Sequence, residues 1–330
     1  METVSPGSAI SPDDAWLLLS AVAAHVAETA GVRALILKGP VLSEFGLRSE
    51  RQSYDLDVLV PRDELSDFLV AMRKAGFHNT DSDDIWHDLA SHSVGLASAA
   101  FPLSVDAHYD FPGLLGDQAE WFDSLWRDRV FVEVAGVSCS VPSPSDSVIL
   151  MALHDLRTPV THRLASDSLR DLASRVSSGS CAATTDEVIA SAARLRALGS
   201  AGRFLAQLAE GVAAPHLEVP RTRLFLWRVR VALGGRLLGV ALERIALTGP
   251  RRGVLLLARA VWPSADDIRG ALPPNARGTG TLAGYRLMRL VRGVTTGGRK
   301  ARRQRSADTI RARQGHERGV LRAGERGEAS

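Results

Sequence analysis

The chain has 330 residues, of which 45% are hydrophobic and 23% are charged, so it can bury a substantial core. This composition excludes a protein that is disordered throughout. The net charge of +3 is unevenly divided, because residues 286–330 hold thirteen Lys or Arg against four Asp or Glu. The basic character therefore belongs to the C-terminal tail and says little about the partners of the remaining residues.

The sequence offers no membrane-spanning helix. No stretch reaches the ~18 uncharged apolar residues that such a helix needs. The closest region, residues 224–262, is interrupted by eight Arg or Glu residues. Residues 1–12 lack the basic and apolar segments of a signal peptide. We therefore expect a cytoplasmic protein.

The first part of the chain mixes helix and strand patterns. Ser11 followed by Pro12 is typical of a helix start, and Gly31 of a helix end. Apolar runs and period-two alternation predict strands, whereas apolar residues at helical spacing predict helices. In chain order we expect a helix over 11–31, a strand over 34–37, helical turns over 40–46, a strand over 55–60, a helix over 63–74, a loop over 78–88, strands over 91–98 and 103–109, a helix over 118–127 and a hairpin over 130–141.

Beyond residue 142 the strand patterns stop. The Pro- and Ser-rich segment 142–145 indicates a boundary, and helix patterns follow over 146–156, 162–175, 186–198, 201–210, 222–247 and 253–261. We predict an α+β protein with an N-terminal mixed-sheet domain (1–142), a mostly α-helical domain (143–285) and a basic, flexible tail (286–330).

Two acidic residues on one predicted strand point to metal chemistry. Asp55 and Asp57 are two positions apart, so both side chains lie on the same face of the strand. Placing two carboxylates together is costly unless a cation lies between them, and oxygen ligands suit Mg²⁺. Asp106, on the predicted strand 103–109, could supply a third carboxylate and complete a two-metal site for phosphoryl or nucleotidyl transfer. The alternative is that the Asp-Leu-Asp segment is only an exposed strand edge.

The residues before this acidic pair carry a family resemblance. An apolar strand, then Lys38-Gly39, then a short helix resembles the opening of the polymerase-β-like nucleotidyltransferase superfamily, although that superfamily usually has Gly-Ser or Gly-Gly at the turn. The combination of this Lys-Gly turn with Arg51-Gln52-Ser53-Tyr54-Asp55-Leu56-Asp57 resembles the bacterial family known as uncharacterised nucleotidyltransferases. Val105-Asp106-Ala107-His108-Tyr109 resembles the later Asp-x-His-aromatic strand of that family, and the resemblance extends from about residue 12 to about residue 290.

The resemblance implies roles for the residues that match the family motifs. Asp55, Asp57 and Asp106 would be the metal-binding and catalytic carboxylates. The residues implied in nucleotide binding are Lys38, Gly39, Arg51 and Ser53. A lysine ammonium beside carboxylates and a triphosphate also gives a sensible balance of charge.

Two histidines remain as candidates. His108 could lie beside Asp106 and orient it, or could be an ordinary polar strand residue. His154, on the predicted helix 146–156, could be structural or could contact the acceptor.

We therefore expect a Mg²⁺-dependent nucleotidyltransferase that uses two metal ions and binds ATP or another nucleoside triphosphate. It would transfer a nucleoside monophosphate to the hydroxyl of a small molecule, an RNA or a protein. The alternative is a catalytically degenerate fold that binds nucleotide or serves as a scaffold. The basic tail, residues 286–330, is a candidate for weak binding to nucleic acid or an anionic surface.

Overall fold

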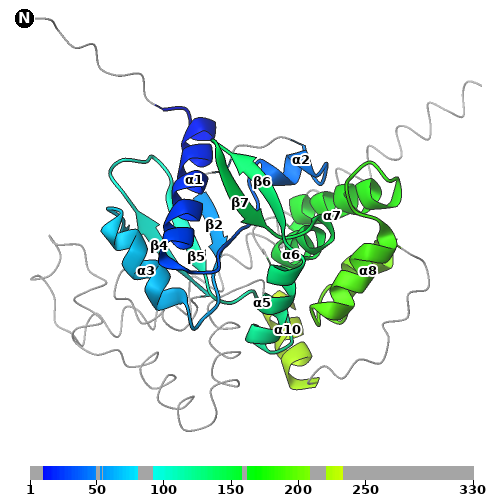
Figure 1. Ribbon diagram of the computed structural model, residues 1–330. Helices are drawn as coiled ribbons and strands as arrows, with labels where there is room; N and C mark the ends of the chain where they lie inside the picture. The colour runs from blue at the N-terminus through cyan, green and yellow to red at the C-terminus, as the bar shows by residue number, and fades with distance from the viewer. Residues whose placement is uncertain are drawn as a thin grey trace, which may run out of the picture. The chain divides into compact units, whose positions relative to one another are not determined.

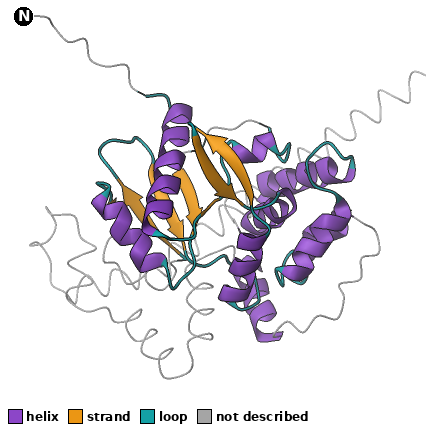
Figure 2. Cartoon of the chain, viewed as in Figure 1, coloured by secondary structure: helices purple, strands orange, loops and turns teal. Residues whose placement is uncertain are grey.

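A computed structural model describes residues 10–49, 53, 55–80, 92–157, 162–208 and 221–232. All of these belong to one compact unit, which combines a mixed β-sheet with α-helices (Figures 1 and 2). The predicted α+β class is confirmed. The predicted tail, residues 286–330, lies outside the described residues, as does the predicted helix 253–261.

The main sheet has five strands in the order β1-β2-β5-β4-β3. Its central strands β2 and β5 are parallel, and the remaining pairs are antiparallel, so the sheet is mixed. A separate hairpin is formed by β6 and β7. The strand bounds are β1 Leu35–Ile36, β2 Asp55–Leu59, β3 His78–Asn79, β4 Ser93–Ala97, β5 Ser104–His108, β6 Val130–Val134 and β7 Val137–Val141.

Helices occupy the connections of the sheet and nearly all of the described chain after β7. Their bounds are α1 Pro12–Ala30, α2 Val41–Glu44, α3 Leu65–Lys74, α5 Gln118–Arg127, α6 Pro144–Arg157, α7 His162–Ser177, α8 Thr185–Arg194, α9 Gly202–Leu208 and α10 Arg221–Ala232. The switch from strands to helices after β7 is the one predicted from the sequence.

The two faces of the sheet are chemically different. Alternate residues of β2 and β5, including Leu56, Val58 and Val105, are buried in a core beneath α1 and α3 (Figure 1). The opposite face carries Asp55 and Asp57 and then Leu59, which joins a second core formed mostly by helical residues. The strand periodicity therefore directs the acidic side chains towards the helical side of the sheet.

The second core spans the predicted domain boundary. It joins residues such as Leu37 and Phe111 to residues of α6, α8, α9 and α10. Ser143 accepts a hydrogen bond from the backbone N–H of Asp146 (3.2 Å), and α6 begins at Pro144. The Pro- and Ser-rich segment thus starts a helix, and the division of the chain at residue 142 stays a prediction.

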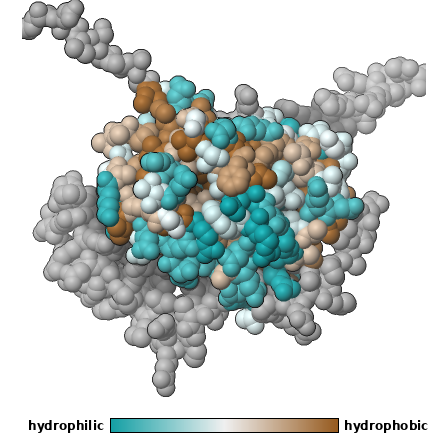
Figure 3. Space-filling model, viewed as in Figure 1, coloured by the Kyte–Doolittle hydropathy of each residue, from teal (hydrophilic) through white to brown (hydrophobic). Residues whose placement is uncertain are grey.

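Local signals set most element ends correctly. Ser11 caps α1 by accepting a hydrogen bond from the backbone N–H of Asp14 (3.1 Å), and Gly31 ends the helix with φ +68°. In α5 the residues Trp121, Phe122 and Leu125 are buried, and hydrophilic side chains gather over this helix on the face shown in Figure 3.

Two observations concern regions where the sequence was less informative. Residues 78 and 79, predicted as part of a loop, form the edge strand β3 because they pair with Leu96 and Ala97 of β4. None of the described helices is long and apolar enough to cross a membrane.

Candidate active site

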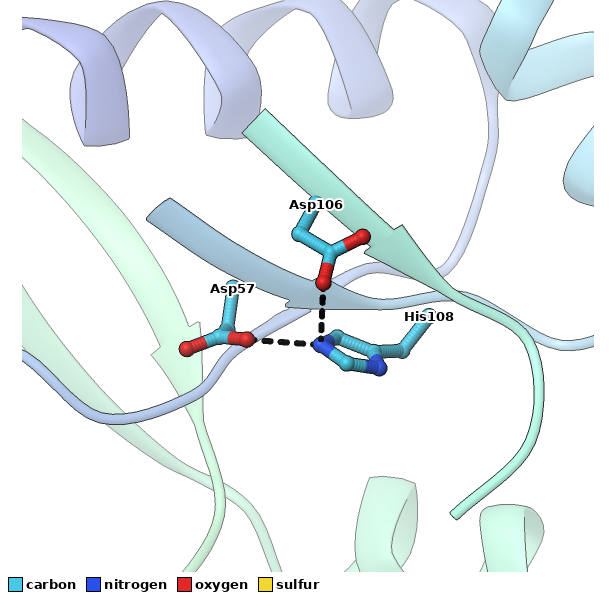
Figure 4. Close-up of side chains that lie close together, drawn as sticks. All are labelled: Asp57, Asp106 and His108. Carbon is cyan, nitrogen blue, oxygen red and sulfur yellow. Dashed lines mark hydrogen bonds and ion pairs between the residues drawn. The ribbon is translucent and has the colours of Figure 1, made fainter. Parts of the chain in front are cut away.

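Three polar side chains converge where β2 and β5 lie side by side (Figure 4). Asp57 and Asp106 are direct partners in the parallel register, and His108 follows two positions after Asp106 on the same face. The Nε2 atom of His108 lies 2.6 Å from Oδ1 of Asp57 and 3.3 Å from Oδ2 of Asp106. The strand pairing alone therefore places two carboxylates and an imidazole within contact distance.

Asp57 is held as a charged carboxylate despite its burial. Its side chain is 7% exposed, and its two oxygens face different partners, His108 at Oδ1 and Nζ of Lys38 at Oδ2 (2.9 Å). Burial alone would raise the pKa of Asp57, but the hydrogen bond with His108 and the charge of Lys38 outweigh it and hold this pKa below its usual range. The site therefore contains a buried anion that is stabilised from two sides.

Lys38 reaches Asp57 because of an unusual turn after β1. Leu37 donates its backbone N–H to the backbone carbonyl oxygen of Asp57 (2.9 Å). Lys38, the next residue, therefore begins close to the side-chain carboxylate of Asp57. Lys38 and Gly39 then both take the left-handed backbone region, with φ +56° and +74°. A lysine rarely adopts this conformation, and such strain concentrates at functional sites.

Gly39 is required by packing as well as by its backbone angle. A Cβ atom at this position would lie 2.1 Å from Cζ2 of Trp16, which is buried in α1. Its carbonyl oxygen accepts a hydrogen bond from Nη2 of Arg48 (2.9 Å). Packing against Trp16 and the backbone angle thus explain why position 39 is a glycine. The predicted contact of Gly39 with phosphate stays a prediction.

We expect Gly39→Ala to destabilise the protein by about 2–4 kcal/mol, because left-handed strain of about 1 kcal/mol adds to the steric cost against Trp16. Gly31→Ala is the matched control: Gly31 has a similar φ of +68°, and no heavy atom lies within 4 Å of the added Cβ. Chemical denaturation of both variants measures the difference. Equal losses would show that Trp16 yields to the methyl group without cost.

Asp55 lies close to the group formed by Asp57, Asp106 and His108 but is not part of it. It is exposed at the start of β2, where it pairs in register with Ser104. Partial burial and the charge of Asp57 raise the pKa of Asp55, while the charge of Lys38 lowers it. Asp55 therefore shares the electrostatic field of the site, but the described group within mutual contact consists of Asp57, Asp106 and His108.

The other predicted residues are placed less directly. Ser53 is partly buried in the segment before β2, and Arg51 lies outside the described residues. His154 is on α6, with Nδ1 3.3 Å from Oδ1 of Asp155. Burial lowers the pKa of His154, as do the charges of Lys38 and Arg157, while the hydrogen bond with Asp155 raises it. His154 thus lies near the Lys38 side of the site.

The sequence interpretation missed Arg157, the last residue of α6. Its Cζ lies 5.2 Å from the ring centroid of Phe111. Burial and the charge of Arg230 lower the pKa of Arg157, and the charges of Asp57 and Asp106 partly oppose that shift, so both carboxylates lie nearby. Its spacing of three from His154 places both residues on one helix face, which was a usable signal.

The donor set fits a divalent cation. One ligand atom from each of Asp57, Asp106 and His108 lies within 4.8 Å of the others. Carboxylate oxygens are the ligands that Mg²⁺ prefers, and an imidazole nitrogen is also accepted by transition metals such as Mn²⁺. The residues needed to hold a metal are therefore present and already face one another.

Comparison with known proteins places the chain in a family. The family model described as "Uncharacterised nucleotidyltransferase" matches residues 19–210, which is more than half of the chain. The chain belongs to this family. The matched segment of this nucleotidyltransferase contains Asp57, Asp106 and His108, together with Lys38, which pairs with Asp57.

Solved structures of other nucleotidyltransferases resemble this one weakly. The antibiotic-resistance factor ANT(2'')-Ia gives a TM-score of 0.38 at 11% identity, over 59% of this chain and 97% of its own. An antigenic nucleotidyltransferase-like protein from Paracoccidioides brasiliensis gives 0.34 at 14% identity, over 62% and 98%. A tRNA nucleotidyltransferase gives 0.25 at 14%, over 83% and 92%. A comparison with curated proteins finds no match.

Proposed function

We propose that this family member transfers a nucleoside monophosphate from a nucleoside triphosphate to an acceptor hydroxyl, with Mg²⁺ held at Asp57 and Asp106. The observation that carries the proposal is the direct pairing of these two aspartates on parallel strands, with Lys38 against Asp57. We keep the predicted number of two metal ions. When bound, they would neutralise phosphate charge and orient the reacting oxygens. Asp55 would complete the acidic set from the exposed end of β2.

The exposure of the two aspartates suggests different roles. Asp57 is 7% exposed and both of its oxygens have protein partners, whereas the side chain of Asp106 is 33% exposed. Asp106 is therefore the better base for a hydroxyl that arrives from solvent. The acceptor oxygen bonds to the α-phosphorus, the bond from that phosphorus to the β-phosphate oxygen breaks, and pyrophosphate leaves. The hydroxyl proton passes to Asp106.

Lys38 is proposed to bind phosphate when the nucleotide enters. Its ammonium group is paired only with Asp57 among the described residues, and its side chain is 23% exposed. A carboxylate that turns towards a metal ion would free Lys38 for a phosphate oxygen. Gly39, Arg51 and Ser53 keep their predicted place beside the nucleotide as part of this proposal.

The function is tested by incubating the protein with each of the four α-labelled nucleoside triphosphates, Mg²⁺ or Mn²⁺, and acceptors from the three classes: aminoglycosides and sugars, RNA, and protein. We expect metal-dependent release of pyrophosphate together with label on one acceptor class. Binding of nucleotide with no transfer to any class would instead support the degenerate, nucleotide-binding alternative. The absence of both metal and nucleotide binding would overturn the proposal.

The basic tail bears on the choice of acceptor. If the acceptor is a nucleic acid, removing residues 286–330 is expected to weaken its binding most strongly at low salt. An unchanged salt dependence would show that the tail takes no part.

The cytoplasmic location also stays a prediction.

Replacing His108 is expected to weaken metal binding about 10- to 100-fold, the usual cost of losing a ligand-orienting group. The reason is that His108 contacts both aspartates and fixes Asp57 with a 2.6 Å hydrogen bond. The measurement is a titration of His108→Ala with Mn²⁺, in which electron paramagnetic resonance reports the free metal ion. His78→Ala, on the exposed edge strand β3, is the control. Identical Mn²⁺ affinity in both variants would remove His108 from the site.

A further inference from the structure

The end of α6 carries a guanidinium group that forms no ion pair with an acidic residue in the described part of the chain. Arg157 lies over the ring of Phe111, with Cζ 5.2 Å from the ring centroid. Phe111 is 1% exposed and follows closely after β5, the strand that carries Asp106 and His108. The Nη1 atom of Arg157 is buried and has no hydrogen-bond partner among the described residues.

An arrangement of this kind is costly without an anion. Arginine remains charged at neutral pH, and a buried N–H of a charged group that lacks an acceptor loses its hydration without compensation. The stack on Phe111 fixes one face of the guanidinium but supplies no acceptor in its plane. Across the described chain, no carboxylate forms an ion pair with Arg157, although the group feels the charges of Asp57, Asp106 and Asp110.

Arg157 has a second cation, Arg230, close enough to affect its charge. Burial and the charge of Arg230 lower the pKa of Arg157 to about 10, so it keeps its proton at neutral pH. Lys38 and Phe111 line the same small pocket between the β1 turn and α6. Lys38 contacts Asp57, and the ring of Phe111 that Arg157 covers has its centroid 6.5 Å from that of His108. An anion held at Asp57 and Asp106 would therefore have both cations nearby.

We infer that Arg157 binds the β- and γ-phosphates of the nucleoside triphosphate and then the pyrophosphate that leaves. The inference rests on the proposed function. The α-phosphate must lie at the carboxylates, whereas Arg157 is near them without contacting them, which places it along the remaining phosphates. A planar guanidinium can donate two parallel hydrogen bonds to phosphate oxygens, and it would stabilise the charge that grows as the bond to the leaving group breaks.

The test compares Arg157→Gln and Arg157→Lys with the wild-type full chain. Isothermal titration with pyrophosphate in the presence of Mg²⁺ is expected to show affinity reduced about 10- to 100-fold in Arg157→Gln. Arg157→Lys, which keeps the charge but loses the fork of donors, should lose less. Affinity for a nucleoside monophosphate and for Mn²⁺ alone should change less than about twofold, because neither ligand reaches α6. Arg170→Gln, on the exposed surface of α7, is the control.

The outcomes separate the two proposals. If the wild type binds neither nucleoside triphosphate nor pyrophosphate, the proposed function fails. If the wild type binds both and Arg157→Gln binds pyrophosphate equally well, only the role of Arg157 is overturned. Circular dichroism establishes that the variants are folded. Should Arg157→Gln be unfolded, Arg157→Lys decides the matter, and an unchanged affinity for pyrophosphate in that variant overturns the inference.

Discussion

Replacing Asp57 with asparagine is expected to lower nucleotidyl transfer by about 10³-fold or more, since metal-held carboxylates act directly on the reacting phosphate. The amide keeps the size of the side chain and can still accept a hydrogen bond from His108. It cannot supply the negative charge that pairs with Lys38 at 2.9 Å and that would hold a cation. Activity should therefore fall far more than stability.

The measurement is the rate of label transfer by Asp57→Asn at saturating nucleotide, together with Mn²⁺ affinity and the thermal midpoint. Asp63→Asn is the matched control, because Asp63 is exposed in the turn before α3 and is not part of the group formed by Asp57, Asp106 and His108. We expect the control to match the wild type in all three quantities. Transfer by Asp57→Asn at the wild-type rate would remove Asp57 from the metal site and leave the proposed mechanism without its central ligand.

The parts of the fold predicted from the sequence are those set by local chemistry. The N-cap at Ser11, the left-handed Gly31 and the alternation in β2 act within a few residues, so they are readable without knowledge of the rest of the chain. The family resemblance was also readable, because the Lys-Gly turn and the Asp-x-Asp strand are short segments. The match over residues 19–210 confirms that family.

The parts that the sequence did not predict depend on neighbours from distant segments. The strand β3 exists only because β4 pairs with it. The reason for Gly39 is Trp16 of α1, and no pattern around Gly39 reveals that contact. His108 could not be assigned a role until the β2–β5 register placed its ring against Asp57 as well as Asp106. The assignment of catalytic roles to these residues stays a prediction.

The helix that carries His154 and Arg157 is itself anchored by a buried acid. Asp146, in the first turn of α6, is fully buried, and its Oδ1 accepts hydrogen bonds from Ser191 and from Nη2 of Arg194 on α8. Arg194 also donates to Ser124 of α5 (2.6 Å) and pairs with Asp128 (3.1 Å). Arg194 therefore connects α8 to both α5 and α6. Of its two acidic partners among the described residues, only Asp146 is fully buried.

Asp146→Ala is expected to destabilise the protein by about 3 kcal/mol, the lower end of the cost of breaking a buried pair, because Arg194 is partly exposed and can regain some water. For a protein of this size that loss corresponds to a fall of about 6–12 °C in the thermal midpoint. Asp128→Ala removes the exposed partner of the same arginine and should cost at most about 1 kcal/mol.

A double-mutant cycle of Asp146→Ala with Arg194→Ala isolates the interaction between these two residues. If the Asp146–Arg194 pair holds α6 in place, Asp146→Ala costs little further stability once Arg194 is absent. The stability losses of the two single variants then add up to more than the loss of the double variant. Strict additivity would mean that Asp146 is held mainly by Ser191. In either case the loss at Asp146 should also weaken pyrophosphate binding, because α6 is the element that positions Arg157 over Phe111. Undiminished pyrophosphate affinity in a folded Asp146→Ala protein would show that the far end of α6 is held in place by its own packing.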